Sequence, residues 1–364
     1  MSRELYAGLM SGTSLDGVDA VLLDLAGARP APLGHAHRAF PPALRAELLA
    51  LNAGAHGELE RAARCANELA RDYADAIAEL LAHATVDRRR LRAIGCHGQT
   101  VRHRPQAGYT VQIGNAALLA ELTGTRVVAD FRSRDVAAGG QGAPLAPAFH
   151  AVMFASDAED RVVLNLGGMA NLSWLGADGG VRGFDTGPGN CLMDLWAQLH
   201  LGRPQDENGA WAAGARADAG LLEALLSEPY FTLPPPKSTG RDLFNSAWLE
   251  RRLPRAAEPR VVQATLLELT AHSVARAIRG HFPAARRLIV CGGGVRNGAL
   301  MTRLELLLSP VPVQSSARHG IEPMQVEAAA FAWLARQAVL GRPGNLPAVT
   351  GARGARVLGA IYPP

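Results

Sequence analysis

The sequence lacks features that mark several common classes of protein. It has a single lysine, Lys237, which follows three prolines, so the glycine–lysine–hydroxyl loop of a P-loop nucleotidase is excluded. No apolar run is long enough to cross a bilayer, and the start of the chain lacks the basic and apolar segments of a signal peptide. We therefore expect no membrane partner and a cytoplasmic location.

Cysteines and aromatic residues are also scarce. The four cysteines lie far apart and form no CxxC pair, which favours reduced thiols over disulfides or zinc ligands. Aromatic residues make up 5% of the chain and the net charge is only +4, with the arginines scattered along it. Because few rings are available to stack on bases, we expect no nucleic-acid partner. The run Arg88–Arg90 is more typical of a solvated loop.

What is present indicates a two-domain α/β protein. At 364 residues the chain is long for one core. Short apolar runs typical of strands alternate with longer helical stripes, which favours ligand binding at the carboxyl ends of strands. The expected strands are 5–10, 18–25, 91–96, 126–129, 161–166 and 287–291. The clearest expected helices are 59–84, 265–278 and 323–340.

The first two expected strands flank a polar turn, SGTSLDG. Consecutive small residues allow backbone N–H groups to converge on an anion, and the hydroxyls of Thr13 and Ser14 can add hydrogen bonds. Asp16 is a candidate carboxylate for a hydrated magnesium ion. The alternative is an ordinary β-hairpin that uses glycine and serine only to turn.

Two further glycine-rich segments follow expected strands. VVLNLGGMANLS has the same strand–turn–strand pattern as the opening segment, with its turn at Gly167 and Gly168. LIVCGGGVRNGALM passes from a strand through Gly292–Gly294 into a helix with Asn297 near its start. The GxGxxG pattern of dinucleotide-binding proteins is absent. Three such segments in one α/β chain indicate a nucleotide site more specifically than any one of them.

Asp185, in FDTGPGNCLMD, is the candidate catalytic carboxylate. We expect it at a strand end, before a rigid Thr-Gly-Pro-Gly turn, where it could take a proton from a hydroxyl or from water. The alternative is a structural Asx-turn that caps the same turn. Asp194 fits better as an ordinary helix residue.

Other polar residues also follow expected strands. Four of them, His97, Gln99, Asp130 and Arg132, are placed to contact sugar hydroxyls or a carboxylate, although a single residue of this kind is more often a structural hydrogen-bonding group. Cys96 is typical of a packed strand residue. Glu327 begins a helix, where the helix dipole alone favours a carboxylate, and a substrate contact is the alternative.

Together these motifs resemble one family along essentially the whole chain. GLMSGTSLDGVDA, CHGQT, QIGN, ADFRSRDVAAGGQGAPL, LNLGGMANLS, FDTGPGNCLMD, PPPKSTGRD and CGGGVRN occur in this order. They resemble anhydro-N-acetylmuramic acid kinase, of the sugar kinase, Hsp70 and actin superfamily. The resemblance implies two ribonuclease H-like (actin-like ATPase) lobes with a central nucleotide cleft, and a homodimer. We expect lobe I at residues 1–135 plus about 325–364, and lobe II at 136–324, carrying much of the nucleotide site.

The resemblance also implies roles for individual residues. Asp185 matches the catalytic aspartate and Glu327 the substrate-contacting glutamate, beside the substrate candidates His97, Asp130 and Arg132. The segment matching the ATP-phosphate site consists of Gly12, Thr13, Ser14, Leu15, Asp16, Gly17, Val18 and Asp19. Gly167 and Gly168 match a second phosphate clamp. The segment matching the adenosine site consists of Gly292, Gly293, Gly294 and Asn297.

The implied reaction uses ATP, Mg²⁺ and an amino sugar. In 1,6-anhydro-N-acetylmuramic acid, O6 closes a ring onto C1, so there is no free 6-hydroxyl to phosphorylate. A base such as Asp185 would activate water to attack C1, as in an inverting glycosidase. The released O6 would then take the γ-phosphoryl group. The product would be N-acetylmuramic acid 6-phosphate, an intermediate of peptidoglycan recycling and amino-sugar catabolism.

Three alternatives stay open at this point. One is an ordinary sugar kinase or an exopolyphosphatase-like hydrolase on the same fold. The second is a catalytically silent ATP-dependent clamp, which an intact Asp185 in a rigid turn disfavours. The third is a dinucleotide-binding oxidoreductase that uses Cys291–Gly294, which the missing GxGxxG pattern disfavours.

Overall fold

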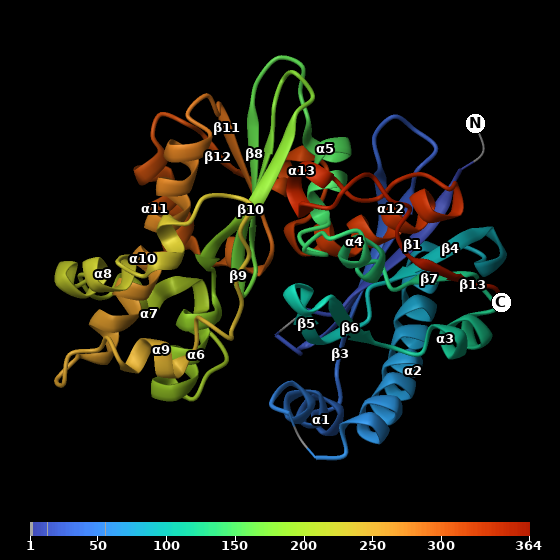
Figure 1. The fold of residues 1–364 in the computed structure, drawn as a ribbon, viewed down its shortest axis with the longest axis horizontal. Coiled ribbons are helices and arrows are strands. Elements are labelled where there is room, and N and C mark those ends of the chain that lie inside the picture. Colours follow the sequence, from blue (N-terminus) through green and yellow to red (C-terminus); the bar gives the residue numbers. More distant parts are fainter. Residues whose placement is uncertain (1–2, 13, 55) are drawn as a thin grey trace. The chain divides into compact units, whose positions relative to one another are not determined.

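The computed structural model describes residues 3–12, 14–54 and 56–364, and divides the chain into two compact units. Unit 1 consists of Met1–Met153 with Met324–Pro364, and unit 2 of Phe154–Pro323. Each unit is an α/β structure with its own mixed sheet (Figure 1). Among the described residues, no helix combines the length and the apolar character needed to cross a membrane.

A six-stranded sheet forms the centre of unit 1, in the order β13-β7-β4-β1-β2-β3. The neighbours β1, β2 and β3 run antiparallel, whereas β1, β4 and β7 run parallel. The edge strand β13 is antiparallel to β7. The strands are β1 Leu5–Met10, β2 Gly17–Asp24, β3 Ala31–Ala39, β4 Leu91–Cys96, β7 Val127–Ala129 and β13 Ala360–Tyr362, with a separate hairpin of β5 Gln99–Arg104 and β6 Tyr109–Ile113.

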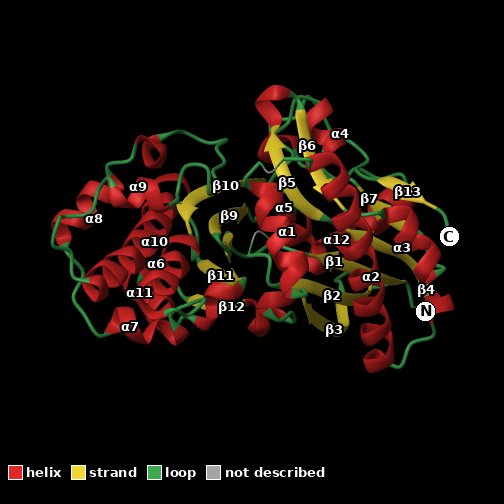
Figure 2. Cartoon of the chain, turned by 90° about the horizontal axis from the view of Figure 1, so that it is seen from below, coloured by secondary structure: helices red, strands yellow, loops and turns green. Residues whose placement is uncertain are grey.

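Helices cover both faces of this sheet, as the red and yellow elements of Figure 2 show. One face packs against α2. The approach is close, since a Cβ added to Gly34 of β3 would lie 3.3 Å from the side chains of Leu80 and Ala84. The other face packs against α12. The helices of unit 1 are α1 Pro42–Asn52, α2 Glu58–Ala84, α3 Ala116–Thr123, α4 Ser133–Ala137, α5 Ala146–Phe154, α12 Val326–Val339 and α13 Pro347–Thr350, with 3₁₀ turns η1 Arg88–Arg90, η2 Pro105–Ala107 and η7 Pro323–Gln325.

Two glycines bring α12 into backbone contact with the sheet. A Cβ on Gly8 of β1 would lie 1.9 Å from the Ala328 carbonyl oxygen, and one on Gly95 of β4 would lie 2.0 Å from that of Phe331. Both positions therefore exclude every other residue unless the helix moves. This close approach fixes where the first turn of α12 lies beside β1 and β4.

A five-stranded sheet forms the centre of unit 2, in the order β10-β9-β8-β11-β12. The strands are β8 Arg161–Leu166, β9 Met169–Leu175, β10 Val181–Pro188, β11 Arg287–Cys291 and β12 Val313–Ser315. The helices are α6 Cys191–Leu201, α7 Ala210–Ala213, α8 Ala219–Leu226, α9 Ser246–Glu250, α10 Pro259–His281 and α11 Gly298–Leu308, with 3₁₀ turns η3 Glu207–Gly209, η4 Pro229–Thr232, η5 Gly293–Arg296 and η6 Ser316–His319.

The two units share one topology. In unit 2, β8, β9 and β10 run antiparallel and β8, β11 and β12 run parallel, which repeats β1, β2, β3 and β1, β4, β7 of unit 1. The first glycine turn joins β1 to β2, and Gly167 and Gly168 join β8 to β9 at the equivalent place. The prediction of an α/β fold with two ribonuclease H-like lobes is confirmed.

Most of the expected elements are present within a few residues of their predicted ends, although α10 begins six residues before the helix expected at 265–278. Two further differences are informative. The helix expected over 59–84 is α2, but Leu59 at its start is 89% exposed, and burial of its apolar stripe begins only at Cys65. Asp185 lies inside β10 rather than at its end, because pairing with β9 resumes after a bulge between Asp185 and Gly187. Pro188 is tolerated there because β10 is an edge strand.

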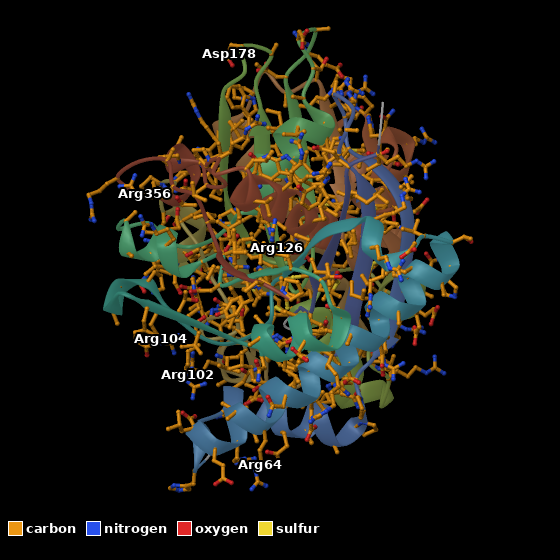
Figure 3. All side chains as sticks on the ribbon, turned by 90° about the vertical axis from the view of Figure 1, so that its right-hand side faces the viewer. Arg64, Arg102, Arg104, Arg126, Asp178 and Arg356 are labelled. Carbon is orange, nitrogen blue, oxygen red and sulfur yellow. The ribbon has the colours of Figure 1, made fainter. Side chains whose placement is uncertain are left out.

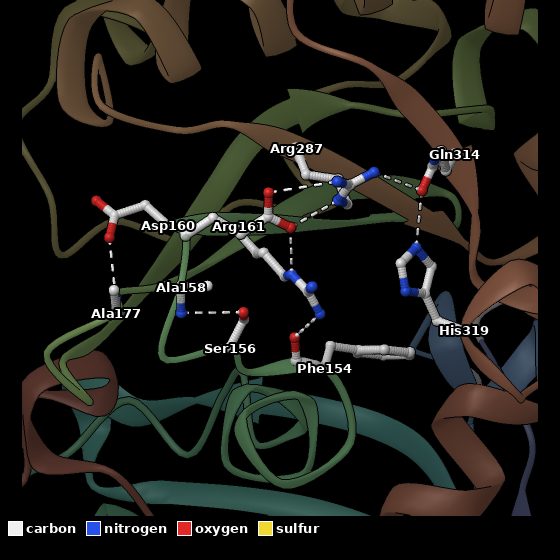
Figure 4. A network of polar contacts seen from close by, with 10 residues as sticks. Phe154, Ser156, Ala158, Asp160, Arg161, Ala177, Arg287, Gln314 and His319 are labelled. Atoms are coloured by element: carbon white, nitrogen blue, oxygen red, sulfur yellow. Dashed lines mark hydrogen bonds and ion pairs between the residues drawn. The ribbon is translucent and has the colours of Figure 1, made fainter.

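A network of ion pairs joins the first residues of β8 and β11 in unit 2 (Figure 4). Glu159 accepts hydrogen bonds from Arg287 Nε at 2.7 Å and from Arg161 Nε at 2.8 Å. Arg287 also donates to Gln314, which contacts His319, and Arg161 donates to the Phe154 carbonyl. The hydrogen bonds from Arg287, assisted by Arg161 and opposed by burial, lower the pKa of Glu159 from 4.5 to about 2.

We expect Glu159→Gln to destabilise the chain at pH 7. Because the folded pKa lies below the ordinary one, the stabilisation is complete above about pH 4.5 and is lost as the pH falls towards about 2. Urea unfolding at a series of pH values should therefore show a gap between the parent and the variant that closes on acidification. Glu223→Gln, on the exposed face of α8, is the control. A gap that stays constant with pH would contradict this account.

Candidate functional site

The turn between β1 and β2 is anchored by one buried apolar residue. Leu15 adopts a left-handed backbone, with φ of 56°, and is 1% exposed. Its N–H donates to the Gly12 carbonyl at 3.3 Å, and the Ser14 hydroxyl donates to Asp16 Oδ1 at 2.7 Å. Burial of Leu15 thus holds a strained turn, while Ser14 and Asp16 stay exposed to solvent. Thr13 lies outside the described residues.

The last residues of the predicted phosphate segment, Gly17, Val18 and Asp19, belong to β2. A Cβ on Gly17 would lie 2.3 Å from the Arg38 carbonyl oxygen, and Val18 is fully buried. Asp19 Oδ1 is contacted by His35 Nε2 at 2.9 Å and His37 Nδ1 at 3.1 Å, both on β3. This end of the segment is therefore part of the sheet.

The segment CHGQT contacts the opening turn directly. Gln99 Nε2 donates to the Gly12 carbonyl at 3.2 Å, and the Ser11 hydroxyl donates to the Gly98 carbonyl at 3.2 Å. The Ser11 hydroxyl also lies 2.8 Å from the hydroxyl of Tyr73 on α2. Residues predicted to bind phosphate and residues predicted to bind sugar are thus neighbours in unit 1.

His97 and Arg132 form a pair beside this turn. Arg132 places Nε at 3.1 Å and Nη2 at 2.9 Å from His97 Nε2, and its Nη1 donates to the Gly142 carbonyl at 2.7 Å. A guanidinium can only donate, so His97 Nε2 is the acceptor and its ring proton sits on Nδ1. Burial, reinforced by the Arg132 charge, holds the pKa of His97 well below its ordinary value, so the imidazole is neutral.

Glu327 lies on the side of α12 that faces this pair. It is half-buried in the first turn of α12, and Phe331 follows it by four residues on the same face. The Phe331 ring lies 4.7 Å from the His97 ring, centroid to centroid. The helix position set by Gly8 and Gly95 thereby brings Glu327 to the side of the sheet where His97 lies.

Asp130 is exposed and has a left-handed backbone, with φ of 57°. Its Oδ1 accepts a hydrogen bond from the Ser133 N–H at 3.4 Å, just after the start of α4. This contact is the kind a structural role would make, and the sugar-binding role of Asp130 stays a prediction.

Asp135 is a buried carboxylate that the sequence did not single out. It is 0% exposed, and its Oδ2 accepts from the Gly142 N–H at 2.8 Å. Its Oδ1 accepts from Asn345 Nδ2 at 2.7 Å and from the Thr350 hydroxyl at 2.8 Å. The backbone of Gly142 is therefore held by Asp135 at its N–H and by Arg132 at its carbonyl, which ties the position of Arg132 to the C-terminal segment.

In unit 2, the Gly167-Gly168 turn is closed by the segment that follows β10. Gly189 N–H and Cys191 N–H donate to the Gly168 carbonyl at 2.9 and 3.1 Å, and Asn190 N–H donates to that of Gly167 at 2.9 Å. A Cβ on Gly189 would lie 2.3 Å from the Gly167 carbonyl oxygen. Two motifs quoted separately from the sequence, LNLGGMANLS and FDTGPGNC, thus form one packed unit.

The segment Gly292–Gly294 packs against the end of β8. Cβ atoms on Gly292 and Gly294 would lie 2.5 Å from Asn165 Oδ1 and 2.6 Å from Leu166 Cβ. Asn297 Oδ1 accepts from the Leu300 N–H at 3.0 Å, so Asn297 caps the N-terminus of α11. Contact with adenosine stays a prediction for this segment.

Asp185 is held by a distant loop rather than by its own turn. Its Oδ2 accepts from the Thr239 N–H at 3.0 Å, and its N–H donates to the Lys237 carbonyl at 3.1 Å. The Tyr230 hydroxyl donates to the Asp185 carbonyl at 2.7 Å. The LPPPKSTGR segment therefore fixes this aspartate. The sequence marked that segment by its single lysine, among 36 arginines, and by the motif PPPKSTGRD, but it did not connect the segment with Asp185.

A hollow of about 360 Å³ opens on unit 2 between the end of α6 and the start of α10. Its lining includes Arg203, Trp211 and Arg260. None of the residues singled out from the sequence lines it, so the hollow does not bear on their roles.

We expect Asp135→Asn to lower the free energy of unfolding by about 3 kcal/mol, because it replaces a buried acceptor facing three donors with an amide. Chemical denaturation measures this effect. Glu121→Gln, exposed on α3, makes the same chemical change outside any such cluster. Equal free energies of unfolding for the two variants would show that the contacts of Asp135 do not stabilise the fold.

Comparison with known proteins gives a consistent result along the chain. The model of a family described as anhydro-N-acetylmuramic acid kinase matches residues 4–364. Relatives with that name come from Bordetella petrii, 58% identical over 99% of this chain and 96% of the relative, and from Cupriavidus pinatubonensis, 56% identical over 98% of each. One from Nitrosospira multiformis is 53% identical over 100% of both.

Solved structures show only distant likeness. An activator of the 2-hydroxyisocaproyl-CoA dehydratase from Clostridium difficile with bound ADPNP is 11% identical, with a TM-score of 0.45 over 90% of this chain and 92% of that one. A ROK family glucokinase from Streptomyces griseus in complex with glucose and AMPPNP is 16% identical, with a TM-score of 0.41 over 92% and 99%.

Proposed function

Because the chain belongs to the anhydro-N-acetylmuramic acid kinase family, we propose that Asp185 and the glycine turns carry out that family's reaction here. The function is the ATP-dependent opening of 1,6-anhydro-N-acetylmuramic acid with phosphorylation of O6, which serves peptidoglycan recycling. The observation that carries it is identity above one half over whole chains. The roles of single residues rest on their geometry and are proposals.

Asp185 acts as the base in this proposal. It takes a proton from water, whose oxygen attacks C1 of the sugar while the C1–O6 bond breaks. The electron pair released on O6 attacks the γ-phosphorus, and the bond to ADP breaks. Water thus supplies the new C1 hydroxyl, and ATP supplies the phosphoryl group. The contacts from Thr239 and Lys237 support the role, because they hold this aspartate in one position.

The glycine turns bind ATP in this proposal. Small residues at Gly12, Gly167 and Gly168 let backbone N–H groups approach phosphate oxygens. Gly292–Gly294 provide a surface without side chains against which adenosine can lie. The strain stored at Leu15 supports the proposal for the opening turn, since strained backbone tends to occur at functional sites.

The sugar contacts His97, Arg132 and Glu327 in unit 1. A neutral His97 with its proton on Nδ1 has a ring N–H that can donate, and the Arg132 guanidinium beside it carries a positive charge and only donates. Asp130 is the weakest of the four sugar-binding candidates, because its carboxylate binds the start of α4.

Magnesium fits the exposed carboxylate of Asp16. Among residues 3–12, 14–54 and 56–364, no group of three or more His, Cys, Asp and Glu side chains is arranged to hold a metal ion. Mg²⁺ does not need such a group, because it usually binds through one or two carboxylates, waters and the phosphates of the nucleotide. When bound, it would offset the negative charge of the transferring phosphoryl group.

The proposal also includes the lobe limits given above, a cytoplasmic location and a homodimer.

The activity is tested by ADP release with Mg-ATP and either 1,6-anhydro-N-acetylmuramic acid or N-acetylmuramic acid. We expect ADP only with the anhydro sugar, and a 6-phosphate product that carries ¹⁸O at C1 when the assay is run in labelled water. Release with the open sugar alone would indicate an ordinary kinase. Release without any sugar would indicate a hydrolase.

We expect Asp185→Asn to lower kcat by about 10³-fold, the range of a lost general base, with little change in ATP binding. The asparagine oxygen can still accept from the Thr239 N–H, so the loop should stay in place. Asp178→Asn, in the β9–β10 turn, is the control (Figure 3). Loss of ATP binding together with turnover would make Asp185 a structural residue.

A further inference from the structure

Lys237 is chemically unlike every other basic residue of the chain. Lys and Arg total 37, and Lys237 is the single lysine, so the other 36 are arginines. Exposed positive charge is supplied by arginine, for example by Arg64, whose side chain is 75% exposed (Figure 3). Lysine and arginine are not interchangeable where a compact charge must fit a small space. The one position that uses lysine is therefore a place to look for such a requirement.

The surroundings of Lys237 match a compact ammonium. Its Nζ donates to the Tyr230 carbonyl at 3.0 Å and to the Phe231 carbonyl at 3.2 Å. It lies 4.7 Å from the centre of the Tyr230 ring and 5.8 Å from that of Phe184. An ammonium can direct separate N–H groups at two successive carbonyls, whereas a guanidinium presents its donors in one plane. The side chain is half-buried.

These contacts connect the two segments that hold Asp185. One is η4, whose Tyr230 hydroxyl donates to the Asp185 carbonyl. The other is the loop whose backbone at Lys237 and Thr239 binds the Asp185 N–H and carboxylate. The ammonium ties the loop back to η4 through the Tyr230 and Phe231 carbonyls. Removing it would loosen both supports of Asp185 together.

The charges of Lys237 and Asp185 also interact. Burial lowers the pKa of Lys237, and the Asp185 carboxylate opposes that shift by raising it. Two titratable neighbours respond to the same pair: burial and the Asp185 charge raise the pKa of Tyr230, while burial and the Lys237 charge lower the pKa of His281. The ammonium of Lys237 and the carboxylate of Asp185 therefore attract each other.

We propose that Lys237 is the positioning residue of the reaction, which locks the 233–241 loop onto Asp185. This rests on the proposed role of Asp185 as base. Lys237 itself touches neither the reacting water nor the transferring phosphoryl group in this account. Its removal should act on kcat through the geometry of Asp185.

The single lysine allows a direct test that does not depend on activity. Growth on lysine labelled with ¹³C at Cε gives a protein with one side-chain resonance, whose pH titration reports Lys237 alone. In Asp185→Asn the midpoint should fall by about one pH unit, because the attraction that opposes burial is gone. Asp178→Asn should leave the midpoint unchanged. An unchanged midpoint in Asp185→Asn would overturn the proposal.

Kinetics give the second measurement. Lys237→Met should lower kcat by about 100-fold, as expected for a displaced catalytic group, with the KM values for ATP and sugar changed by less than about threefold. Lys237→Arg keeps the charge but should recover only part of the loss. Arg255→Met, which removes an exposed positive charge from unit 2, is the control.

The outcomes separate the two proposals. If Lys237→Met has a much lower melting temperature than the parent, its kinetics cannot be interpreted. The kinetics of Lys237→Arg and the titration of the labelled lysine then test the proposal. A kcat for Lys237→Met equal to that of the parent, or a loss confined to KM, would overturn the positioning role. Absence of any phosphoryl transfer by the parent would instead overturn the proposed function, while the titration would still decide whether Lys237 and Asp185 interact.

Discussion

The contact of α12 with the sheet at Gly8 and Gly95 is the constraint on which the site in unit 1 depends. Because no Cβ intervenes, helix backbone meets strand backbone, and the helix can occupy only one position. That position sets the Phe331 ring on His97 and places Glu327 one turn earlier on the same side. His97 accepts hydrogen bonds from Arg132, and Arg132 also donates to the Gly142 carbonyl. The N–H of Gly142 donates to Asp135. The packing of one helix against two glycines therefore affects the position of every candidate sugar contact except Asp130.

In unit 2, a loop rather than a helix holds the candidate catalytic residue Asp185 in place. Its catalytic candidate lies on an edge strand, which offers no second neighbouring strand to hold it. The missing support comes from the segment LPPPKSTGR, whose backbone and ammonium bind Asp185 and the neighbouring η4. The contacts that hold Gly142 and Arg132 in unit 1 involve the buried carboxylate of Asp135, whereas those around Asp185 in unit 2 involve the half-buried side chain of Lys237. Both arrangements restrict the charged side chain of a candidate site residue to one place.

The sequence was informative where structure depends on local pattern. Strands such as β1, β4 and β8 and the helix α2 follow from apolar runs and periodicity, and the shared fold of the units follows from the quoted motifs. It was silent on Asp135, whose partners Asn345 and Thr350 lie more than two hundred residues away along the chain. It misplaced Asp185 at a strand end, because a bulge lets β10 continue through Gly187 and Pro188. Residue types at strand ends could nominate His97 and Arg132, but not show that one hydrogen-bonds the other.

The repeated strand order carries a consequence for the origin of the chain. Two units with the same order and directions, each with a glycine turn after its first strand, are what duplication of one ancestral gene produces. Their sequences have diverged because such a scaffold constrains little beyond apolar alternation and a few glycines. The same strand order carries the His97–Arg132 pair in unit 1 and Asp185 in unit 2.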